Sequence, residues 1–589
     1  MKLGRNLNNS QIAKLLRSVA AAYELKPGDN RFRIIAYERA ADAIEHSSSE
    51  IKDLWDEGEL NSLAGVGESI ASSLDELFRT GKVKHYEDIL SGIPAAVFEL
   101  MDVPGIGPKT AIKLCKELGI TRPHGAIEKL EKAAHKGRIE NIEGFGEDSQ
   151  KSILENIAQW KNRSHRVTLD VATQTANQIL EWLHQIPQVK EVEPLGSLRR
   201  KASTIGDIDI AVASDKPEVV ITHFTQYPKK TRIIEAGPTS ASILLPTGIQ
   251  VDLMVQPPAR FGALLQHFTG SKHHNIALRE FAIKKGLSLS ERGIKKGEKL
   301  TEYQTEKEFY EALDLDWISP ELREDNGEIE AALKHNLPHL VELADIKGDL
   351  HMHSDFNIEP SHDLGISSMS EYVAKAIKLG YEYIGFSEHN PSLSMHNKTE
   401  ITELLRHKKM QVEEIISSGK HRGINILNGL EIDIRPDGSL ALPEEGFTYL
   451  DYAIVSIHGS FKGTKADQTR RVIKALTHPK AKILGHPTGR KLGEREGVDL
   501  DWDQIFDFCL KENKIVEINS SPDRLDLPDV LVHEAVKAGV NLIIDTDSHA
   551  TQTMDMMQYG ISVARRGWAT KRNIVNTLPW DEFKKLIAQ

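Results

Sequence analysis

The sequence contains few cysteines and no long apolar run. Only Cys115 and Cys509 occur among 589 residues, and no two cysteines are spaced as CxxC. This excludes a disulfide framework and a zinc site built from thiolates. No segment approaches the ~20 apolar residues of a membrane span, and the start of the chain has no apolar run typical of a signal peptide. We therefore expect a cytoplasmic protein that makes no membrane contact.

The net charge of -12 is distributed unevenly along the chain. Residues 301–350 hold 14 acidic and 4 basic groups, whereas residues 151–300 hold 21 basic and 14 acidic groups. The basic surplus of that segment leaves a polyanion open as a partner, although the whole chain is acidic. With 40% hydrophobic and 27% charged residues, the composition is that of a globular protein. The length predicts about three to five domains.

Three short segments, at 63–74, 100–114 and 139–154, share a Gly-x-Gly pair followed by an amphipathic helix. Paired glycines allow a turn with positive φ and a close backbone approach, and the free N–H groups that open the next helix can bind an anion. Such a hairpin can hold DNA phosphates without reading the base sequence. A plain turn between helices is the alternative for any single copy. The candidate DNA-binding residues are Gly65, Gly67, Gly105, Gly107 and Lys109.

Two expected strands carry three aspartates on one face. Asp207 and Asp209 alternate with apolar residues in IGDIDIAVA, and Asp252 occupies the same kind of position in GIQVDLMVQ. Carboxylates on neighbouring strands can hold two Mg²⁺ or Mn²⁺ ions, one that activates a hydroxyl and one that holds a triphosphate. A lone Asp-x-Asp more often lies on a solvated strand. The nearby Gly-Ser turn, the Arg199-Arg200 pair and the third aspartate favour the metal site.

These residues carry a family resemblance. The motifs GSLRR, GDID, VDL and HFTGSKHHN resemble the palm and thumb of the family X DNA polymerases, over about residues 1–316. The resemblance implies that Asp207, Asp209 and Asp252 bind the catalytic metals. It further implies that Ser197 and Arg200 contact the triphosphate, that Phe268 and Gly270 pack against the deoxyribose, and that Asn275 touches the base or the minor groove. The nucleotide-binding candidates are therefore Gly196, Ser197, Arg200, Phe268, Gly270 and Asn275.

One feature of that family is missing. Its deoxyribose-phosphate lyase forms a Schiff base through a lysine on the helix after the first hairpin. Ser73 occupies that position here, and no lysine occurs between Leu60 and Arg79. Because a hydroxyl cannot form an imine, we expect lyase activity at this site to be weak or absent.

The last 239 residues hold 12 of the 24 histidines, and several of them lie at the ends of apolar runs. Examples are DLHMHS, YEYIGFSEHN, DYAIVSIHGS and LIIDTDSHA. In a barrel of parallel strands, residues at the carboxyl ends of the strands converge on one mouth. Imidazoles mixed with carboxylates suit Zn²⁺, Mn²⁺ or iron. The pattern predicts a metal site at that mouth.

This part resembles the PHP (polymerase and histidinol phosphatase) family over nearly its full length. The resemblance assigns one metal to His351, His353, Glu431 and Asp547, and a second to Glu431, His458 and His486. A third would take His389 and His549 with His362 or Asp363, and Glu359 is another option. The resemblance thus implies two or three zinc, manganese or iron ions. Arg490 and Arg524 are candidates for a phosphate contact, and surface charge is the equally open alternative.

The expected fold is multidomain, with helical helix-hairpin-helix domains, an α/β nucleotidyltransferase palm with a thumb, and a distorted (β/α)7 PHP barrel. The expected boundaries are 1–82 and 83–160 for the two helical domains, 161–260 for the palm, 261–318 for the thumb, 319–345 for an acidic linker and 346–589 for the barrel.

The expected function is template-directed filling of short gaps in DNA from dNTPs, by a monomer, with a metal-dependent 3′-5′ exonuclease in the barrel and an abasic-site endonuclease as a further option. DNA is expected to lie against residues 1–300, away from the acidic segment. The alternatives are a polymerase with a purely structural barrel, a small-molecule phosphatase fused to a DNA-binding module, and a non-catalytic scaffold for DNA ends.

Overall fold

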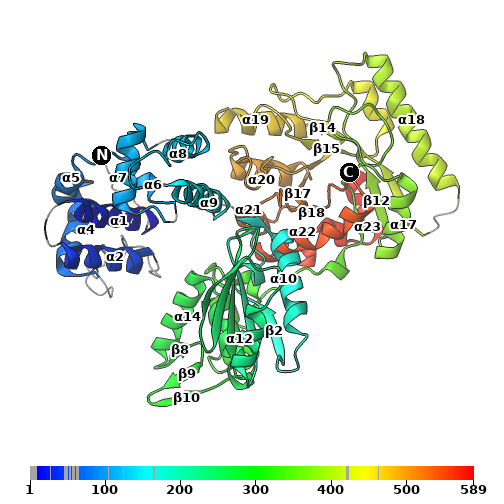
Figure 1. The fold of residues 1–589 in the computed structure, drawn as a ribbon. Coiled ribbons are helices and arrows are strands. Elements are labelled where there is room, and N and C mark those ends of the chain that lie inside the picture. The colour runs from blue at the N-terminus through cyan, green and yellow to red at the C-terminus, as the bar shows by residue number, and fades with distance from the viewer. Residues whose placement is uncertain are drawn as a thin grey trace. The chain divides into compact units, whose positions relative to one another are not determined.

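The computed structural model describes residues 9–588 except 27, 29, 46–50, 52–54, 56–59, 61–65, 104, 124, 164–165, 419–422 and 462. The chain divides into two compact units, Met1–His165 and Arg166–Gln589. Figure 1 colours the first unit blue to cyan and the second cyan to red. Among the described residues, no helix combines the length and the apolar character needed to cross a membrane.

The first unit is helical and has two separate apolar cores. The first core lies among the amino-terminal helices and contains residues such as Leu16 and Leu74. The second core contains Leu114 and Leu130. The helices of this unit are α1 (Asn9–Leu25), α2 (Arg31–Glu45), α4 (Glu68–Thr80), α5 (Lys84–Leu90), α6 (Ala96–Leu100), α7 (Pro108–Leu118), α8 (Ala126–His135) and α9 (Glu147–Arg163).

The second unit begins with a five-stranded sheet of order β2-β4-β7-β6-β5. In β7 the buried Val251, Leu253 and Val255 alternate with less buried residues, as expected for a strand with one face in a core. The strands are β2 (Glu191–Pro194), β4 (Ile208–Ala213), β5 (Arg232–Ala236), β6 (Ser240–Leu244) and β7 (Gln250–Gln256), and β1 (Val167–Thr168) pairs with β3 (Thr204–Ile205). The accompanying helices are α10 (Leu169–Leu183), α11 (Gly196–Arg199) and α12 (Pro217–Thr225).

A smaller subdomain follows, in which a three-stranded sheet packs beside helices around Phe309 and Tyr310. Its elements are α13 (Phe261–Thr269), α14 (Lys272–Lys284), β8 (Ser288–Ser290), β9 (Gly293–Lys296), β10 (Lys299–Thr301) and α15 (Glu306–Glu311). Glu306 is buried and binds two guanidinium groups, those of Arg199 at 2.8 Å and Arg323 at 2.7 Å. This shared carboxylate ties α11 to the smaller subdomain.

Parallel strands form the remainder of the second unit, in sheets of order β11-β12-β13 and β14-β15-β16-β17-β18. Single parallel bridges, His389 to Glu431 and Met352 to Ser548, join the two sheets at both sides. If β13 and β14 are counted as one interrupted strand, the two sheets close into a barrel of seven strands. The strands are β11 (Gly348–Asp349), β12 (Tyr383–Phe386), β13 (Asn425–Asn428), β14 (Glu431–Asp433), β15 (Ala453–Ser456), β16 (Ala481–Leu484), β17 (Ile515–Asn519) and β18 (Leu542–Asp545).

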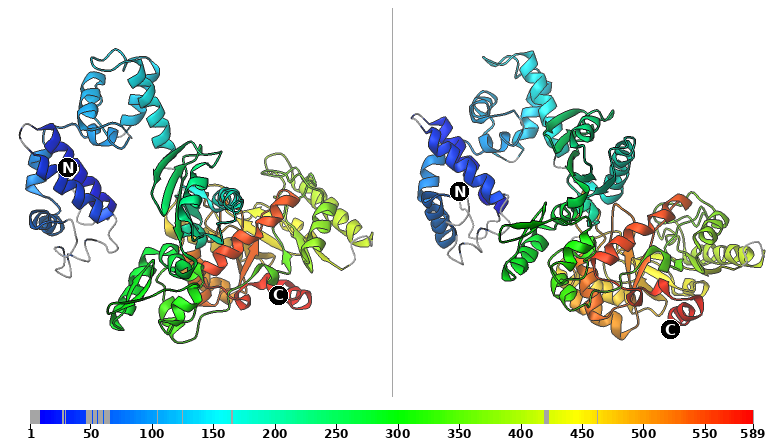
Figure 2. Two further views of the ribbon diagram at one scale, coloured as in Figure 1. Left: turned by 60° about the horizontal axis from the view of Figure 1, so that its bottom comes forward. Right: turned by 90° about the horizontal axis from the view of Figure 1, so that it is seen from below.

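Helices cover the barrel, because its strands are buried along their length, as in β15 and β17, and need apolar cover on their outer face. These helices are α17 (Met369–Leu379), α18 (Lys398–Ser417), α19 (Lys465–Leu476), α20 (Trp502–Lys511), α21 (Asp529–Ala538), α22 (Met557–Arg566) and α23 (Trp580–Ala588). One buried apolar cluster contains both Leu169 of α10 and Met557 of α22, so it joins the five-stranded sheet domain to the barrel. Figure 2 shows the second unit, with α22 in red, from two further sides.

The acidic segment 319–345 is packed rather than extended. It contains the turns η3 (Pro320–Leu322) and η4 (Leu343–Asp345) and the helix α16 (Glu328–Leu333). Glu321 binds Arg565 at 2.8 Å, and Glu328 is buried against His274, with 2.6 Å between the carboxylate and Nδ1. Part of its negative charge therefore lies inside the protein and does not face solvent as a belt.

Candidate active sites

The three predicted aspartates lie on or beside two adjacent strands. Strands β4 and β7 are parallel neighbours, and Asp209 is directly opposite Asp252 in their register. Asp207 immediately precedes β4. Burial raises the pKa of Asp209 to about 7, with Asp207 and Asp252 acting in the same direction and Arg200 opposing them. Crowded carboxylates of this kind fit a divalent cation, because a bound cation removes their mutual repulsion.

The turn before this face leaves no room for a side chain. Gly196 has φ of +56°, and a Cβ there would lie 2.4 Å from Oδ2 of Asp209. Asp252 is oriented by Gln250, whose Nε2 donates to both carboxylate oxygens at 3.0 and 3.1 Å, and by the hydroxyl of Ser242. The carboxylate of Asp252 is thus held by residues of the same sheet.

The nucleotide-binding candidates gather beside the aspartates. Ser197 lies in α11, and Arg200 follows it with Nη1 donating to the carbonyl of Thr269 at 2.5 Å. A Cβ on Gly270 would lie 3.1 Å from that same Nη1. Phe268 packs partly buried against a small apolar cluster that includes Leu195 of the turn before α11.

Asn275 is already committed to protein partners. Its Nδ2 donates to the carbonyl of His267 at 2.7 Å, and its Oδ1 accepts from Gln266 at 2.9 Å. Because the amide group has a second N–H and its oxygen a second lone pair, these bonds orient Asn275 without excluding a contact to a base or to the minor groove.

The hairpin positions differ in whether their backbone conformation requires glycine. Gly105 has φ of +77°, whereas Gly67 and Gly107 are extended N-caps of α4 and α7, and a Cβ on either would meet nothing within 4 Å. Gly65 lies outside the described residues. Lys109 is exposed at the start of α7, and its Nζ is 3.7 Å from a carboxylate oxygen of Glu24. The open space at Gly67 and Gly107 is what the close approach of another backbone requires.

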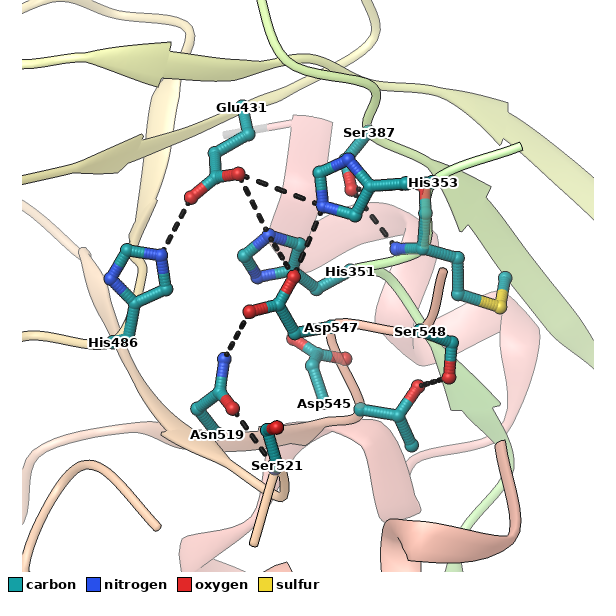
Figure 3. Close-up of polar contacts among 12 residues, drawn as sticks. His351, His353, Ser387, Glu431, His486, Asn519, Ser521, Asp545, Asp547 and Ser548 are labelled. Atoms are coloured by element: carbon teal, nitrogen blue, oxygen red, sulfur yellow. Dashed lines mark hydrogen bonds and ion pairs between the residues drawn. The ribbon is translucent and has the colours of Figure 1, made fainter. Parts of the chain in front are cut away.

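The barrel mouth gathers four of the predicted metal ligands. Nε2 of His351 lies 3.3 Å from Glu431 and 3.5 Å from Asp547, and Nε2 of His353 lies 3.6 and 3.1 Å from the same two carboxylates. Figure 3 shows the imidazoles and carboxylates turned toward one another. All four ligand atoms fall within 4.8 Å of each other, which suits a single ion.

Glu431 is the centre of the cluster. Its Oε1 lies 2.8 Å from His486 and 3.4 Å from His458, and its Oε2 lies 2.9 Å from Nδ1 of His389. Burial alone would raise the pKa of Glu431, but the surrounding histidines outweigh it and hold the pKa well below its ordinary range. An ionised carboxylate whose two oxygens face different histidines can bridge two cations.

The structure separates the three candidates for the remaining ligand. The carboxylate of Asp363 lies 3.3 Å from both His389 and His549. His362 instead contacts Asp433 at 3.0 Å, and Glu359 contacts His396 at 3.1 Å. The geometry therefore favours Asp363 as the partner of His389 and His549.

Two acidic residues of this site were not singled out from the sequence. Asp433 accepts from His362 and from Nδ1 of His458 at 2.7 Å, and Glu517 binds Nδ1 of His351 at 2.6 Å. Asp433 is two residues after Glu431 in one strand, so strand alternation would have placed both on the same face. Glu517 is the middle residue of β17, and an acidic residue between apolar neighbours in a strand was the signal available for it.

Buried atoms without partners test whether these residues fit a metal. Among the described residues, Nε2 of His351, both ring nitrogens of His353 and Oε2 of Glu431 are buried and have no hydrogen-bond partner. Buried polar atoms normally have hydrogen-bond partners. A group of nitrogen and oxygen atoms without such partners is suited to act as ligands of divalent cations. The same donor set does not distinguish zinc from manganese or iron.

The two arginines near this site have different surroundings. Arg490 donates from Nε to the carbonyl of Arg524 at 2.8 Å and from Nη2 to the carbonyl of Leu525, so its guanidinium supports a loop. Arg524 has Nε 3.8 Å from Asp547 and a buried Nη1 without a partner among the described residues. Of the two, Arg524 is the better placed for an anion at the metal cluster.

Comparison with known families matches most of the chain. The families described as "Helix-hairpin-helix domain" and "SAM-like Helix-hairpin-helix tandem" match residues 7–83 and residues 57–119 and 97–158. "DNA polymerase beta thumb" matches residues 264–324, and "PHP domain" matches residues 349–521.

Three curated proteins illustrate how far the similarity extends. The chain is 34% identical to the DNA polymerase/3′-5′ exonuclease PolX of Bacillus subtilis over 97% of both chains. It is 24% identical to DNA polymerase lambda of Rattus norvegicus over 54% of this chain and 56% of that protein. It is 29% identical to a probable phosphatase of Clostridium acetobutylicum over 35% of this chain and 80% of that protein. The similarity over nearly the full length includes both candidate sites.

Proposed function

Because the chain belongs to the family X DNA polymerases with a carboxyl-terminal PHP domain, we propose that it fills short gaps in DNA and degrades DNA from the 3′ end. The observation that carries this proposal is the similarity to a DNA polymerase/3′-5′ exonuclease over 97% of both chains. The partners would be DNA and dNTPs, the active form a monomer, and the domain boundaries those expected above. The alternative of a small-molecule phosphatase draws on a match that covers only 35% of the chain.

In the polymerase site, Asp207, Asp209 and Asp252 would hold Mg²⁺ or Mn²⁺. When bound, these cations lower the pKa of the primer hydroxyl and neutralise the triphosphate. The protein's own part is to orient the triphosphate through Ser197 and Arg200, since a guanidinium stabilises the charge that spreads over the phosphoryl oxygens during transfer. The nearby Gly196 keeps the turn close to Asp209.

In the barrel, the histidines and carboxylates around Glu431 would hold two or three cations. When bound, such cations activate water at neutral pH and stabilise charge on the phosphate. Arg524 would donate its unpaired N–H groups to the phosphate being cleaved. Glu517 accepts from Nδ1 of His351 and thereby keeps Nε2 directed at the ligand cluster.

The polymerase proposal is tested by nucleotide incorporation on a duplex with a one-nucleotide gap. The parent should extend the primer with Mg²⁺ or Mn²⁺, and Asp207→Ala with Asp209→Ala should lower the rate at least about 1,000-fold. Asp215→Ala is the matched control, because that exposed aspartate pairs with Lys190 at the surface. Parental incorporation by the double variant would exclude this site.

The nuclease proposal is tested on a 3′-unpaired primer carrying a 5′ label, with Mn²⁺ and without dNTPs. His351→Ala with His353→Ala should abolish shortening of the primer while leaving incorporation intact. His407→Ala, an exposed histidine on α18, is the control. Equal shortening by the double variant and the parent would show that the barrel is not the nuclease and would favour a structural role for it.

A further inference from the structure

Arg200 is held by protein partners on two of its three nitrogens. Its Nε donates to Glu324 at 2.9 Å and its Nη1 donates to the carbonyl of Thr269 at 2.5 Å. Among the residues that the structure describes, Nη2 has no hydrogen-bond partner. A guanidinium carries five N–H donors in a fixed plane, so fixing two of them fixes the direction of the rest.

Glu324 is held in turn by the barrel. Nη1 of Arg566, the last residue of α22, donates to the same Glu324 oxygen at 2.9 Å and to the carbonyl of Arg200 at 2.8 Å. Nε of Arg566 donates to Asp529 of α21 at 2.7 Å, which anchors it in the barrel. One barrel side chain therefore contacts both the main chain of Arg200 and the carboxylate that orients its side chain.

Positive and negative side chains alternate along these contacts. The side chains of Arg566, Arg200 and Glu324 are only 9%, 15% and 24% exposed. Burial alone would raise the pKa of Glu324, but Arg566 and Arg200 outweigh it and lower the pKa. The carboxylate therefore stays ionised at neutral pH, and charge-assisted hydrogen bonds at low exposure are stronger than those at an open surface.

We propose that Arg566 and Glu324 are positioning residues of the polymerase site, through which the barrel holds Arg200 ready for the triphosphate of the incoming nucleotide. This inference rests on the proposed function, because it takes Arg200 as a triphosphate contact. A long arginine side chain loses rotamer entropy when it is ordered. Ordering it before the nucleotide arrives removes that cost from binding. The barrel is then a working part of the polymerase site as well as a nuclease.

The expected result is a change in nucleotide affinity more than in turnover. In full-length Arg566→Ala, KM for dNTP on gapped DNA should rise about tenfold and kcat should change less than about threefold, since the aspartates are untouched. Shortening of a 3′-unpaired primer should equal that of the parent. Arg566→Lys keeps one charged contact to Glu324 and should recover part of the affinity.

Arg565→Ala is a matched control at the next position of α22. Arg565 also joins the barrel to the acidic segment, through Glu321 at 2.8 Å and the carbonyl of Val341 at 3.2 Å, but it contacts neither Arg200 nor Glu324. Its KM for dNTP should equal that of the parent. An equal rise in KM for Arg565→Ala would mean that any loosening of this interface has the effect, and would overturn the proposal.

A double-mutant cycle adds a second criterion. If Arg566 acts only through Arg200, then Arg566→Ala should have no further effect on KM in an Arg200→Ala background. A further rise in that background would overturn the proposal. Should Arg566→Ala lose nuclease activity as well, Glu324→Gln replaces it, with Glu321→Gln as its control and the same expected tenfold rise.

Tripolyphosphate separates this inference from the proposed function. Calorimetry of tripolyphosphate binding needs no catalysis, and Kd should rise about tenfold in Arg566→Ala and stay at the parental value in Arg565→Ala. A parent that binds tripolyphosphate but incorporates no nucleotide would defeat the proposed polymerase function and leave the positioning role standing. Equal Kd values for the parent and Arg566→Ala would defeat the positioning role.

Discussion

Replacing Glu517 by glutamine should weaken metal binding in the barrel without changing the polymerase. Glu517 is buried, with one oxygen 2.6 Å from Nδ1 of His351 and the other accepting the backbone N–H of His486. It thus orients one ligand ring and the backbone of another ligand. Loss of such a partner typically lowers metal affinity about 10- to 100-fold. That range corresponds to about 1.4 to 2.8 kcal/mol of binding free energy.

The measurement is equilibrium dialysis against buffered Mn²⁺, with the bound metal counted per chain by mass spectrometry. Glu512→Gln makes the same chemical change at an exposed position and should bind Mn²⁺ as the parent does. Incorporation on gapped DNA reports whether Glu517→Gln is folded. A folded Glu517→Gln with the parental Mn²⁺ affinity would refute the reasoning, because His351 would then be oriented by something else.

Three further predictions concern the remainder of the chain. Burial alone would raise the pKa of Glu306, but two buried guanidinium groups outweigh it and hold the pKa at about 2, below the ordinary 4.5. The carboxylate then contributes up to about 3 kcal/mol to the free energy of unfolding above pH ~4.5, and this contribution is lost as the pH falls toward 2. In acid-unfolding curves, Glu306→Gln should lack this pH-dependent contribution, whereas Glu311→Gln should keep it. Gly196→Ala should lower kcat/KM for incorporation at least about 100-fold, because its Cβ would displace Asp209, and a variant with near-parental kcat/KM would contradict this. Borohydride should trap no covalent complex with 5′-deoxyribose-phosphate DNA, because the hydroxyl of Ser73 forms no imine, whereas efficient trapping would reveal a lysine elsewhere.

The fold class was predictable because the chain's local patterns agree with its architecture. Glycine pairs before amphipathic helices indicated the helical unit, and polar residues at the ends of apolar strands indicated the barrel. The predicted fold class is confirmed by the family matches and agrees with the structure. Alternation indicated the face that Asp209 and Asp252 each occupy on their own strand, whereas their direct pairing across β4 and β7 comes from the structure.

Contacts between distant parts of the chain were not predictable. Glu517 is 166 positions from the histidine that it orients, and Arg566 is 242 positions from Glu324. The periodicity of neither segment predicts which distant residue it contacts. For the acidic segment, composition shows the charge of Glu321 and Glu328 but not the low exposure of their side chains. The choice between His362 and Asp363 also needed coordinates, because adjacent residues face different directions in an irregular loop.

The apolar cluster shared by α10 and α22 limits how the gene can be divided. A chain cut between the smaller subdomain and the barrel would leave the cluster half-covered on each fragment, and exposed apolar surface of that kind promotes aggregation. In assays of such fragments, loss of activity could not be distinguished from loss of solubility. Genetic separation of the two reactions should therefore rely on substitutions within an intact chain.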